Sequence, residues 1–322
     1  MKICLLYASE NPYGGWVTYT RHLHDMLAAK HSVTLAKFKD VASTKKRKFG
    51  YGLEYLPSTV QSIMAEQYDA VLVVAVQKNF AERTREILAC IPRSGIVVHD
   101  GNEKKHVPVD ELLHRVVVIR ECNLRLALGS IYVPHPYIRA GLRNTGTKTA
   151  VSVSRIDHDK NTTILLDANR INKLIDIRGF ENRIYTRFRV MPAYPEWVQS
   201  KAHFPRESLA AVSILKDYKF MVDMSTIKGD GGGSQYTFLE AIDAGVCCVL
   251  HGDWVKIPGE FVEGSNCLAA STPEQLVKVL TKTSNEKRKA LVRAAEDLLI
   301  LHDPKIILPQ YEKFLKSLTR RK

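Results

Sequence analysis

Apolar residues in the first half of the chain form short continuous runs, and segments with helical spacing separate these runs. Apolar positions recur at helical spacing over residues 17–29, and a further helix is predicted over residues 79–90. Continuously apolar strands that alternate with helices are typical of a parallel sheet covered on both faces. The runs that predict strands cover residues 2–8, 32–38, 69–75, 95–99, 115–120 and 131–133.

The second half repeats this architecture without repeating the sequence. Strands are predicted at residues 149–154, 183–186, 188–191, 219–224 and 246–250. Helices are predicted at residues 161–172, 205–216, 234–244, 273–282, 286–301 and 304–318. A polar turn at 143–147 predicts a boundary, which gives domains of residues 1–145 and 146–322. The expected fold class is α/β, with two Rossmann-like doubly wound domains that face each other across a cleft and bind ligands at the carboxyl ends of their strands.

Length and composition agree with two domains, each with its own hydrophobic core. A chain of 322 residues is longer than one core usually supports, and 45% of its residues are hydrophobic. No apolar run approaches the roughly 20 residues that cross a bilayer, so no membrane span is expected. The N-terminal run 2–8 is too short for the apolar region of a signal peptide, and we therefore expect a first strand and a cytoplasmic protein.

The cysteine and histidine residues indicate neither disulfides nor a metal site. Six cysteines lack the CxxC spacing of metal and redox motifs, and most lie in apolar stretches, so buried thiols are expected. The eleven histidines show no metal-ligand spacing. No metal ion and no cofactor are therefore predicted.

The chain is strongly basic, with a formal net charge of +13. Residues 1–150 carry 21 Lys and Arg against 13 Asp and Glu, so the excess leans toward the first half. Part of it lies in the polar, weakly periodic segment 40–58, which is predicted to be a mobile loop that closes over a ligand. Such a surface suits a polyanionic partner, although a solvated basic face without a partner is the alternative. The residues expected to contact nucleic acid are Lys45, Lys46, Arg47, Lys48, Lys104 and Lys105.

The second half is organised around a glycine-rich loop and the helix that follows it. Residues 229–233 include four glycines, whose bare backbone N–H groups can approach a bulky anion closely. Ser234 is a suitable N-cap for the helix. Glu240 lies near the far end of this helix, before Gly245 and a buried strand, so its carboxylate needs a polar partner such as a sugar hydroxyl. The pattern indicates a phosphate and sugar site, and an exposed glycine turn before an ordinary helix is the alternative.

The segment from Val151 to Asn161, with the sequence VSVSRIDHDKN, resembles the strand, loop and helix of retaining GT-B glycosyltransferases. In that family an Arg and a Lys five residues apart hold the diphosphate of a nucleotide-sugar donor, and the matching residues here are Arg155 and Lys160. Two cations that converge on a pyrophosphate stabilise the charge that develops as it leaves. A surface Arg and Lys that merely flank a turn are the alternative interpretation.

Other segments resemble the same family, in order, along nearly the whole chain. Gly14-Gly15 after the first strand resembles the family's opening loop. His99-Asp100, at the end of a predicted strand, resembles its His-Asp turn, and Leu239-Glu240-Ala241 resembles its donor-sugar helix. The resemblance implies the GT-B fold and a donor site that includes both halves of the chain.

One departure from the family pattern narrows the resemblance. Many members carry two glutamates with seven residues between them, and Gly232 stands where the partner of Glu240 would be. The bacteriophage DNA α-glucosyltransferases also lack the first glutamate, and they carry a Tyr-Thr-x-Leu-Glu segment like residues 236–240 here. They share the Arg-Lys pair and the His-Asp turn. The chain is most similar in pattern to these enzymes, which decorate hydroxymethylated bases.

This resemblance implies a retaining, metal-independent hexosyltransferase that moves glucose from UDP-glucose to a hydroxymethylated pyrimidine in double-stranded DNA. It assigns Glu240 to the donor ribose and Asp100, with His99, to the acceptor hydroxyl. The residues implied in catalysis are His99, Asp100, Arg155 and Lys160. The residues implied to bind the donor are Gly14, Gly15, Arg155, Lys160, Gly231, Gly232, Gly233, Tyr236, Thr237 and Glu240.

Two other functions stay open at this stage. The same fold and donor could serve a cell-surface or lipid-linked glycan, in which case basic residues would face anionic lipid headgroups. Lys-rich amphipathic stretches with exposed Trp or Phe would be expected for that acceptor, and the sequence shows no clear example. The missing glutamate also allows a catalytically silent, basic nucleic-acid-binding protein on this fold. No motif fixes the sugar, the nucleotide, the acceptor base or the oligomeric state.

Overall fold

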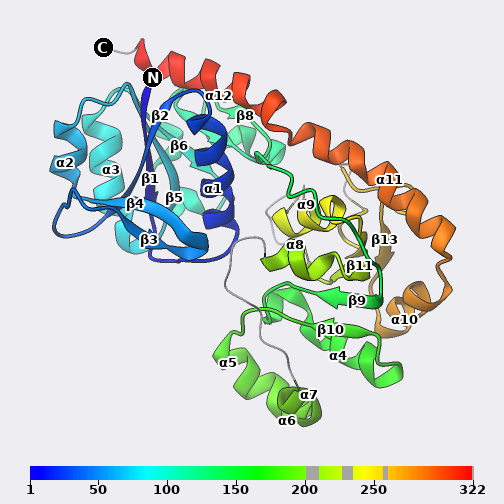
Figure 1. The fold of residues 1–322 in the computed structure, drawn as a ribbon. Helices are drawn as coiled ribbons and strands as arrows, with labels where there is room; N and C mark the ends of the chain where they lie inside the picture. The colour runs from blue at the N-terminus through cyan, green and yellow to red at the C-terminus, as the bar shows by residue number, and fades with distance from the viewer. Residues whose placement is uncertain (201–209, 227–234, 257–259, 321–322) are drawn as a thin grey trace. The chain divides into compact units, whose positions relative to one another are not determined.

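The protein is described by a computed structural model that covers residues 1–200, 210–226, 235–256 and 260–320 (Figure 1). The chain forms two compact units. The first contains Met1–Ile138 together with the chain from Leu301 onward, and the second extends from Arg139 to Ile300. The units therefore divide after Ile138 and not near residue 145, and the last helix groups with the first unit, although the sequence placed it in the second domain.

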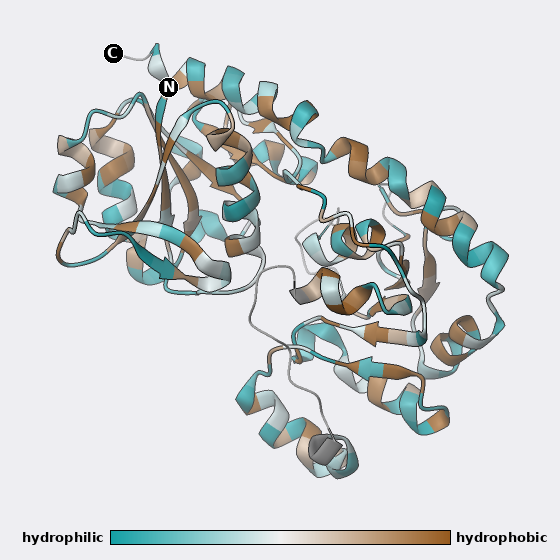
Figure 2. Ribbon diagram, viewed as in Figure 1, coloured by the Kyte–Doolittle hydropathy of each residue, from teal (hydrophilic) through white to brown (hydrophobic). Residues whose placement is uncertain are grey.

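The first unit is built on an eight-stranded sheet with the order β3-β4-β2-β1-β5-β6-β7-β8. All neighbouring strands are parallel except β3, which pairs antiparallel with β4. The central strands are buried apart from one partly buried residue at the start of the first strand. Their residues are largely hydrophobic, as Figure 2 shows. The strands are β1 (Lys2–Ala8), β2 (Ser32–Phe38), β3 (Arg47–Phe49), β4 (Leu53–Ser58), β5 (Ala70–Val76), β6 (Ser94–Val98), β7 (Val116–Val118) and β8 (Ile131–Tyr132).

Helices of the first unit bury their apolar sides on this sheet. The hydroxyl groups of Tyr19 and Tyr311 form a buried hydrogen bond that joins the first helix of the chain to the last. The α-helices are α1 (Gly15–Ala28), α2 (Val60–Ala65), α3 (Ala81–Cys90) and α12 (Pro304–Thr319). Short 3₁₀ turns are η1 (Gly50–Gly52), η2 (Lys78–Phe80), η3 (Glu103–Lys105), η4 (Val109–Glu111) and η5 (Glu121–Leu126).

The second unit has a five-stranded, wholly parallel sheet with the order β10-β9-β11-β12-β13. Its strands are β9 (Lys148–Ser152), β10 (Ile175–Ile177), β11 (Tyr218–Asp223), β12 (Cys247–His251) and β13 (Leu268–Ala270). Its α-helices are α4 (Thr162–Ile171), α5 (Arg183–Tyr185), α6 (Met191–Ala193), α7 (Pro195–Ser200), α8 (Ala210–Leu215), α9 (Tyr236–Asp243), α10 (Pro273–Lys282) and α11 (Asn285–Leu301). A 3₁₀ turn, η6 (His158–Lys160), follows β9, and a π-helical turn, η7 (Thr186–Val190), joins α5 to α6.

The predicted α/β class with two parallel sheets is confirmed, and several local predictions are wrong. Segment 40–58 contains β3 and β4 instead of a loop, because Leu53 and Tyr55 alternate with exposed Glu54 and pack inward. Residues 183–191 are helical and not two strands, and the short strands β10 and β13 were missed. Two cysteines, Cys90 and Cys122, are exposed, whereas the other four are buried, and none of the six forms a disulfide within the described structure.

Two predicted absences can be compared with the described residues. No helix there is long and apolar enough to cross a membrane. Within the same residues, no group of three or more His, Cys, Asp and Glu side chains could hold a metal ion.

Candidate active site

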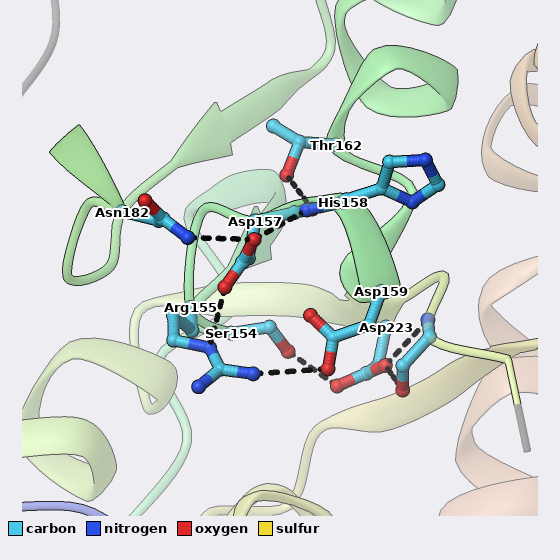
Figure 3. A network of polar contacts seen from close by, with 9 residues as sticks. Ser154, Arg155, Asp157, His158, Asp159, Thr162, Asn182 and Asp223 are labelled. Carbon is cyan, nitrogen blue, oxygen red and sulfur yellow. Dashed lines mark hydrogen bonds and ion pairs between the residues drawn. The ribbon is translucent and has the colours of Figure 1, made fainter. Parts of the chain in front are cut away.

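The loop after β9 carries Arg155, the first of the two cations that the sequence singles out. Its side chain is 54% exposed and forms two ion pairs within the loop (Figure 3). Nε lies 3.3 Å from Oδ2 of Asp157, and Nη2 donates to Oδ2 of Asp159 at 2.9 Å. The guanidinium group is therefore held near the carboxyl end of β9 by two carboxylates of its own loop.

Contacts with neighbouring segments fix the shape of this loop. Oδ1 of Asp157 accepts hydrogen bonds from the backbone N–H of His158 at 2.7 Å and from Nδ2 of Asn182 at 3.1 Å. Asn161 adopts a left-handed conformation with φ of 46°, and its Nδ2 donates to the backbone oxygen of Met224 at 2.9 Å. The loop is thus tied to the segments that follow β10 and β11.

Lys160, the second cation, ends η6 five residues after Arg155. Its side chain is partly buried, and among the residues that the structure describes its ammonium group forms no ion pair. The two cations therefore differ in whether an existing ion pair has to break before an anion can bind. Lys160 is available at once, whereas Arg155 has to exchange a carboxylate partner for the incoming anion.

A buried carboxylate supports the start of the loop from the adjacent strand. Asp223 ends β11, is fully buried, and accepts a hydrogen bond from the hydroxyl group of Ser154, the residue before Arg155. Its other oxygen accepts from the backbone N–H of Ser225 at 2.8 Å and from the Ser225 hydroxyl group. The backbone oxygen of Ser225 in turn accepts from Nε1 of Trp254 at 2.7 Å. Asp223 was missed in the sequence, although a carboxylate at the carboxyl end of an apolar strand was the available signal.

The glycine loop, with Gly231, Gly232, Gly233 and the predicted N-cap Ser234, lies outside the described residues. Helix α9 begins just after it at Tyr236, whose side chain is buried, and Thr237 is partly buried. The helix presents a buried apolar side that includes Phe238, which contacts the rings of Trp254 and Phe261 edge-on. These contacts fix α9 on the sheet and thereby fix the position of Glu240.

Glu240 lies on α9 with its carboxyl group in an environment that disfavours charge. Burial, followed by the negative charge of Asp243, raises the pKa of Glu240 to about 8. Within the described part of the chain its carboxyl group forms neither a hydrogen bond nor an ion pair. A partly buried carboxyl group without a polar partner is suited to hydroxyl groups of a ligand.

The raised pKa of Glu240 predicts a pH-dependent stability. The folded state binds more protons than the unfolded state between the ordinary pKa of 4.5 and about 8, so the free energy of unfolding falls as pH rises through this window. The slope reaches about 1.4 kcal/mol per pH unit. Urea unfolding of the parent protein and of Glu240→Gln should show a steeper loss in the parent, because Glu103 contributes a loss of the same sign to both proteins. Parallel pH profiles for the two proteins would contradict the assignment.

In the first unit, Gly14 and Gly15 form the junction between β1 and α1. Gly14 has a φ of 97°, which favours glycine, and a Cβ atom added at either glycine would meet nothing within 4 Å. The N-terminus of the 14-residue helix α1 therefore opens onto free space. Exposed N–H groups at such a helix terminus can bind an anion.

The loop before Gly14 is anchored on both sides. The Tyr7 hydroxyl group donates to the backbone oxygen of Asn11 at 2.6 Å. Glu10 forms ion pairs with Lys37 at 3.1 Å and with Lys39 at 3.2 Å. These bonds and charges outweigh the effect of burial, which alone would raise the pKa of Glu10, and the net pKa is lowered. The loop that carries the two glycines is therefore held by the ends of β1 and β2.

His99 and Asp100 follow β6, as the sequence predicts. His99 is buried, its Nε2 lies 2.8 Å from the backbone oxygen of Val74, and burial lowers its pKa to about 4. It is therefore neutral and donates to that oxygen. Asp100 is partly exposed, and its Oδ1 accepts from the N–H of Asn102 at 2.7 Å. These contacts favour Asp100 as the group that meets a ligand and His99 as its support.

Glu103, which the sequence did not single out, stabilises this turn. It is buried, and its Oε2 accepts a hydrogen bond from the backbone N–H of His99 at 3.0 Å. Its Oε1 is buried without a hydrogen-bond partner in the described structure. Burial raises the pKa of Glu103 well above its ordinary value, and the charge of Asp100 adds to this effect. A buried glutamate four residues after the histidine gives no sequence signal, because an acidic residue beside Lys104 and Lys105 resembles a solvated turn.

The residues predicted to contact nucleic acid are exposed, but they form two groups. Lys45, Lys46, Arg47 and Lys48 lie on or beside β3, at one edge of the sheet, and all four are exposed. Lys46 and Lys48 lie 3.8 Å and 3.9 Å from Glu54 on β4. Lys104 and Lys105 lie on η3 after β6, four strands away from β4 in the sheet order. The structure therefore places the larger basic group on a sheet edge and separates it from the smaller one.

Comparison with known proteins gives likeness in structure only. No model of a protein family matches the chain, and no curated protein has a similar sequence. Anabaena HepE, solved with UDP and glucose, matches with a TM-score of 0.72 and 14% identity over 98% of this chain and 100% of HepE. An α-glucosyltransferase with UDP and a DNA 13-mer containing an HMU base matches at 0.70 and 12% identity, over 98% and 99% of the two chains.

A third solved structure extends the range of bound molecules. A variant of TarM from S. aureus, solved with fondaparinux, α-GlcNAc-glycerol and UDP, matches with a TM-score of 0.72 and 9% identity. The match covers 98% of this chain and 100% of TarM. Likeness at these identities concerns the fold and leaves activity undecided. The chain has the GT-B glycosyltransferase fold.

Proposed function

We propose that this protein is a retaining glycosyltransferase that moves a hexose, glucose in the first instance, from a UDP-sugar to a hydroxymethylated pyrimidine in double-stranded DNA. The proposed donor site is supported by the loop after β9, which holds Arg155 and Lys160 at the carboxyl end of a parallel strand. Ligands of doubly wound sheets bind at that end. Solved proteins with the same fold hold UDP, which has the diphosphate this pair would neutralise.

The donor diphosphate would be bound by charge and by backbone N–H groups. Arg155 would release Asp157 or Asp159 and bond a phosphate oxygen, while Lys160 supplies the second positive charge. The glycines at 231–233 and at Gly14-Gly15 are proposed to add backbone donors. Glu240 would accept hydrogen bonds from the ribose hydroxyl groups, which would give its carboxyl group a polar partner that the described residues do not supply.

In the proposed reaction the bond between the anomeric carbon and the diphosphate oxygen breaks, and a bond to the acceptor oxygen forms on the same face of the sugar. Charge that develops on the leaving diphosphate is stabilised by Arg155 and Lys160, so the step needs no metal ion. The acceptor proton leaves to the departing phosphate, and Asp100 orients the acceptor hydroxyl group. His99 and Glu103 would keep Asp100 in place.

DNA is the acceptor that the basic sheet edge favours. The exposed cations of residues 45–48 suit a phosphate backbone, and their binding would weaken with salt. One solved protein of the same fold is an α-glucosyltransferase with DNA that contains HMU. The segment Tyr236 to Glu240 also keeps the pattern that the sequence shares with DNA α-glucosyltransferases.

A glycan acceptor is the second candidate, and one observation favours it. Residues 184–191 expose bulky apolar side chains next to arginines, which suits a membrane-associated acceptor. TarM was solved with α-GlcNAc-glycerol and HepE with glucose, so proteins of this fold hold sugars and sugar conjugates as well as DNA. A catalytically silent nucleic-acid-binding protein is the remaining alternative.

The experiment that tests the proposal incubates the protein with radiolabelled nucleotide sugars and a set of DNAs. The DNAs contain cytosine, thymine, hydroxymethylcytosine or hydroxymethyluracil in one sequence context. Label from UDP-glucose should enter only the hydroxymethylated DNAs. Release of free sugar without transfer to any DNA would favour the glycan acceptor. No turnover of any nucleotide sugar, with DNA binding retained, would favour the silent scaffold.

A further inference from the structure

The segment after β10 exposes an apolar stripe that the fold does not use. Residues 183–193 form α5, η7 and α6, and Asn182 caps the segment by accepting from the N–H groups of Ile184 at 3.1 Å and Tyr185 at 3.3 Å. One side of the segment packs into the core of the second unit through Tyr185, Val190 and Tyr194. Hydrophilic and hydrophobic residues alternate along the segment in Figure 2. These core contacts explain the apolar residues on the buried side of the segment but not those on its exposed side.

The opposite side carries three large apolar residues in the open. Ile184 is 72% exposed, Phe188 is 65% exposed and Met191 is 47% exposed. Their spacing of four and three residues places them along one face of a helical segment. We name Ile184, Phe188 and Met191 the apolar stripe. Single exposed apolar residues are common on protein surfaces, but three in register on one face indicate an interaction site.

Three arginines surround the apolar stripe. Arg183, Arg187 and Arg189 are exposed, and the guanidinium carbon of Arg187 lies 5.4 Å from the centre of the Phe188 ring. Among the described residues none of the three forms an ion pair. The carboxylate of Glu196, on α7, is bound by Arg170 at 3.2 Å. The surface therefore combines an apolar centre with a positive border.

We propose that the apolar stripe docks on the surface of an anionic lipid bilayer. A helical segment with a bulky apolar face and arginines beside it lies in the plane of a membrane interface, where the apolar side chains enter the headgroup and acyl boundary. The arginines then face lipid phosphates, whose negative surface potential attracts them. The apolar side chains and the arginines would thus both be satisfied in the interfacial layer of the membrane.

Two other occupants fit the surface less well. A second copy of this chain, packed about a twofold axis, would bring six arginines together around the stripe, and among the described residues none of these arginines forms an ion pair that would neutralise it. Duplex DNA would satisfy the arginines, but it offers apolar surface only where base steps are unstacked, at an energetic cost. The inference goes beyond the proposed function and rests on neither the donor nor the acceptor assigned there.

Vesicle co-sedimentation of the full chain tests the proposal. The parent protein should pellet with phosphatidylcholine vesicles that contain phosphatidylglycerol, and much less with phosphatidylcholine alone. The double variant Ile184→Ser, Phe188→Ser should lower the bound fraction roughly tenfold, as should Arg183→Ala, Arg187→Ala. Ile171→Ser is the matched control, because Ile171 is 53% exposed in the same unit but lies outside the stripe.

Folding and competing partners are measured on the same variants. Thermal unfolding should be unchanged, because the replaced side chains are exposed. Equal pelleting of the parent and both double variants would overturn the proposal. A double variant that keeps vesicle binding but loses retention on duplex DNA would also overturn it and would assign the stripe to DNA. A double variant that keeps vesicle binding but changes the oligomeric state would assign the stripe to a second copy of the chain.

Discussion

Arg155→Ala is expected to lower sugar transfer roughly 10²- to 10³-fold, the effect of removing one group that stabilises developing negative charge. The same loss is expected for Lys160→Ala. Arg155→Lys should recover part of the rate, because a lysine keeps the charge but loses the second N–H donor of the guanidinium. The rate of transfer from UDP-glucose at saturating acceptor is the measurement.

The fold should tolerate these changes. Arg155 is 54% exposed, and its ion pairs with described residues are to carboxylates of its own loop, so its replacement should change the free energy of unfolding by about 0.5 kcal/mol or less. Lys173→Ala is a matched control, because Lys173 is an exposed lysine of the same unit that the proposal does not use. Parent-like transfer by both Arg155→Ala and Lys160→Ala would remove the basis for the donor site.

Asp223→Ala is expected to lower the free energy of unfolding by about 2–4 kcal/mol. Asp223 is fully buried, and its removal leaves the hydroxyl groups of Ser154 and Ser225 and the N–H of Ser225 without their acceptor. Asp223→Asn should cost less, because one carboxamide oxygen remains and a serine hydroxyl group can accept from the amide. Urea unfolding followed by circular dichroism measures both variants.

The same substitution should also weaken donor binding, because Ser154 precedes Arg155 and would lose its anchor. Asp40→Ala is the control for stability. Asp40 is 90% exposed and forms a surface ion pair with Arg83, so its loss should change the free energy of unfolding by at most about 1 kcal/mol. If Asp223→Ala were no more destabilising than Asp40→Ala, the buried carboxylate would not support the loop.

The carboxylates around Arg155 bear on how tightly a donor would bind. In the structure the charge of Arg155 is balanced within the loop by Asp157 and Asp159. A diphosphate has to displace these carboxylates from the guanidinium group. Arg155 therefore adds to the binding free energy only by the difference between the two interactions. The proposed site therefore relies on Lys160 and on backbone N–H groups for much of its affinity.

The sequence predicts well those elements whose pattern is local and strong. The boundaries of β1, β2 and α10 match the structure residue for residue, since continuous apolar runs and a Pro at the helix start identify them without tertiary context. The Arg155 and Lys160 pair was singled out from a family resemblance within one short segment, and its role stays a prediction. The elements and site residues that the sequence did not predict depend on contacts between distant segments.

Two regions show why those contacts escaped sequence reasoning. The alternating residues 183–190 suggest a strand, but Tyr185 and Val190 pack into the core from a helical segment capped by Asn182. In segment 40–58, charge concealed the short strands β3 and β4, whose pairing buries Leu53 and Tyr55. The two buried acids Asp223 and Glu103 support the site through bonds to Ser154 and to the N–H of His99, and these partners cannot be identified from the sequence.

Calorimetric titration of UDP into the parent protein, Arg155→Ala and Lys160→Ala tests the central claim most directly. We expect saturable binding to the parent and affinity at least roughly tenfold lower in each variant, since each loses a charge-assisted bond to the diphosphate. Absence of binding to the parent by UDP and by every other nucleoside diphosphate, or equal affinity in all three proteins, would contradict the donor site proposed for the loop after β9.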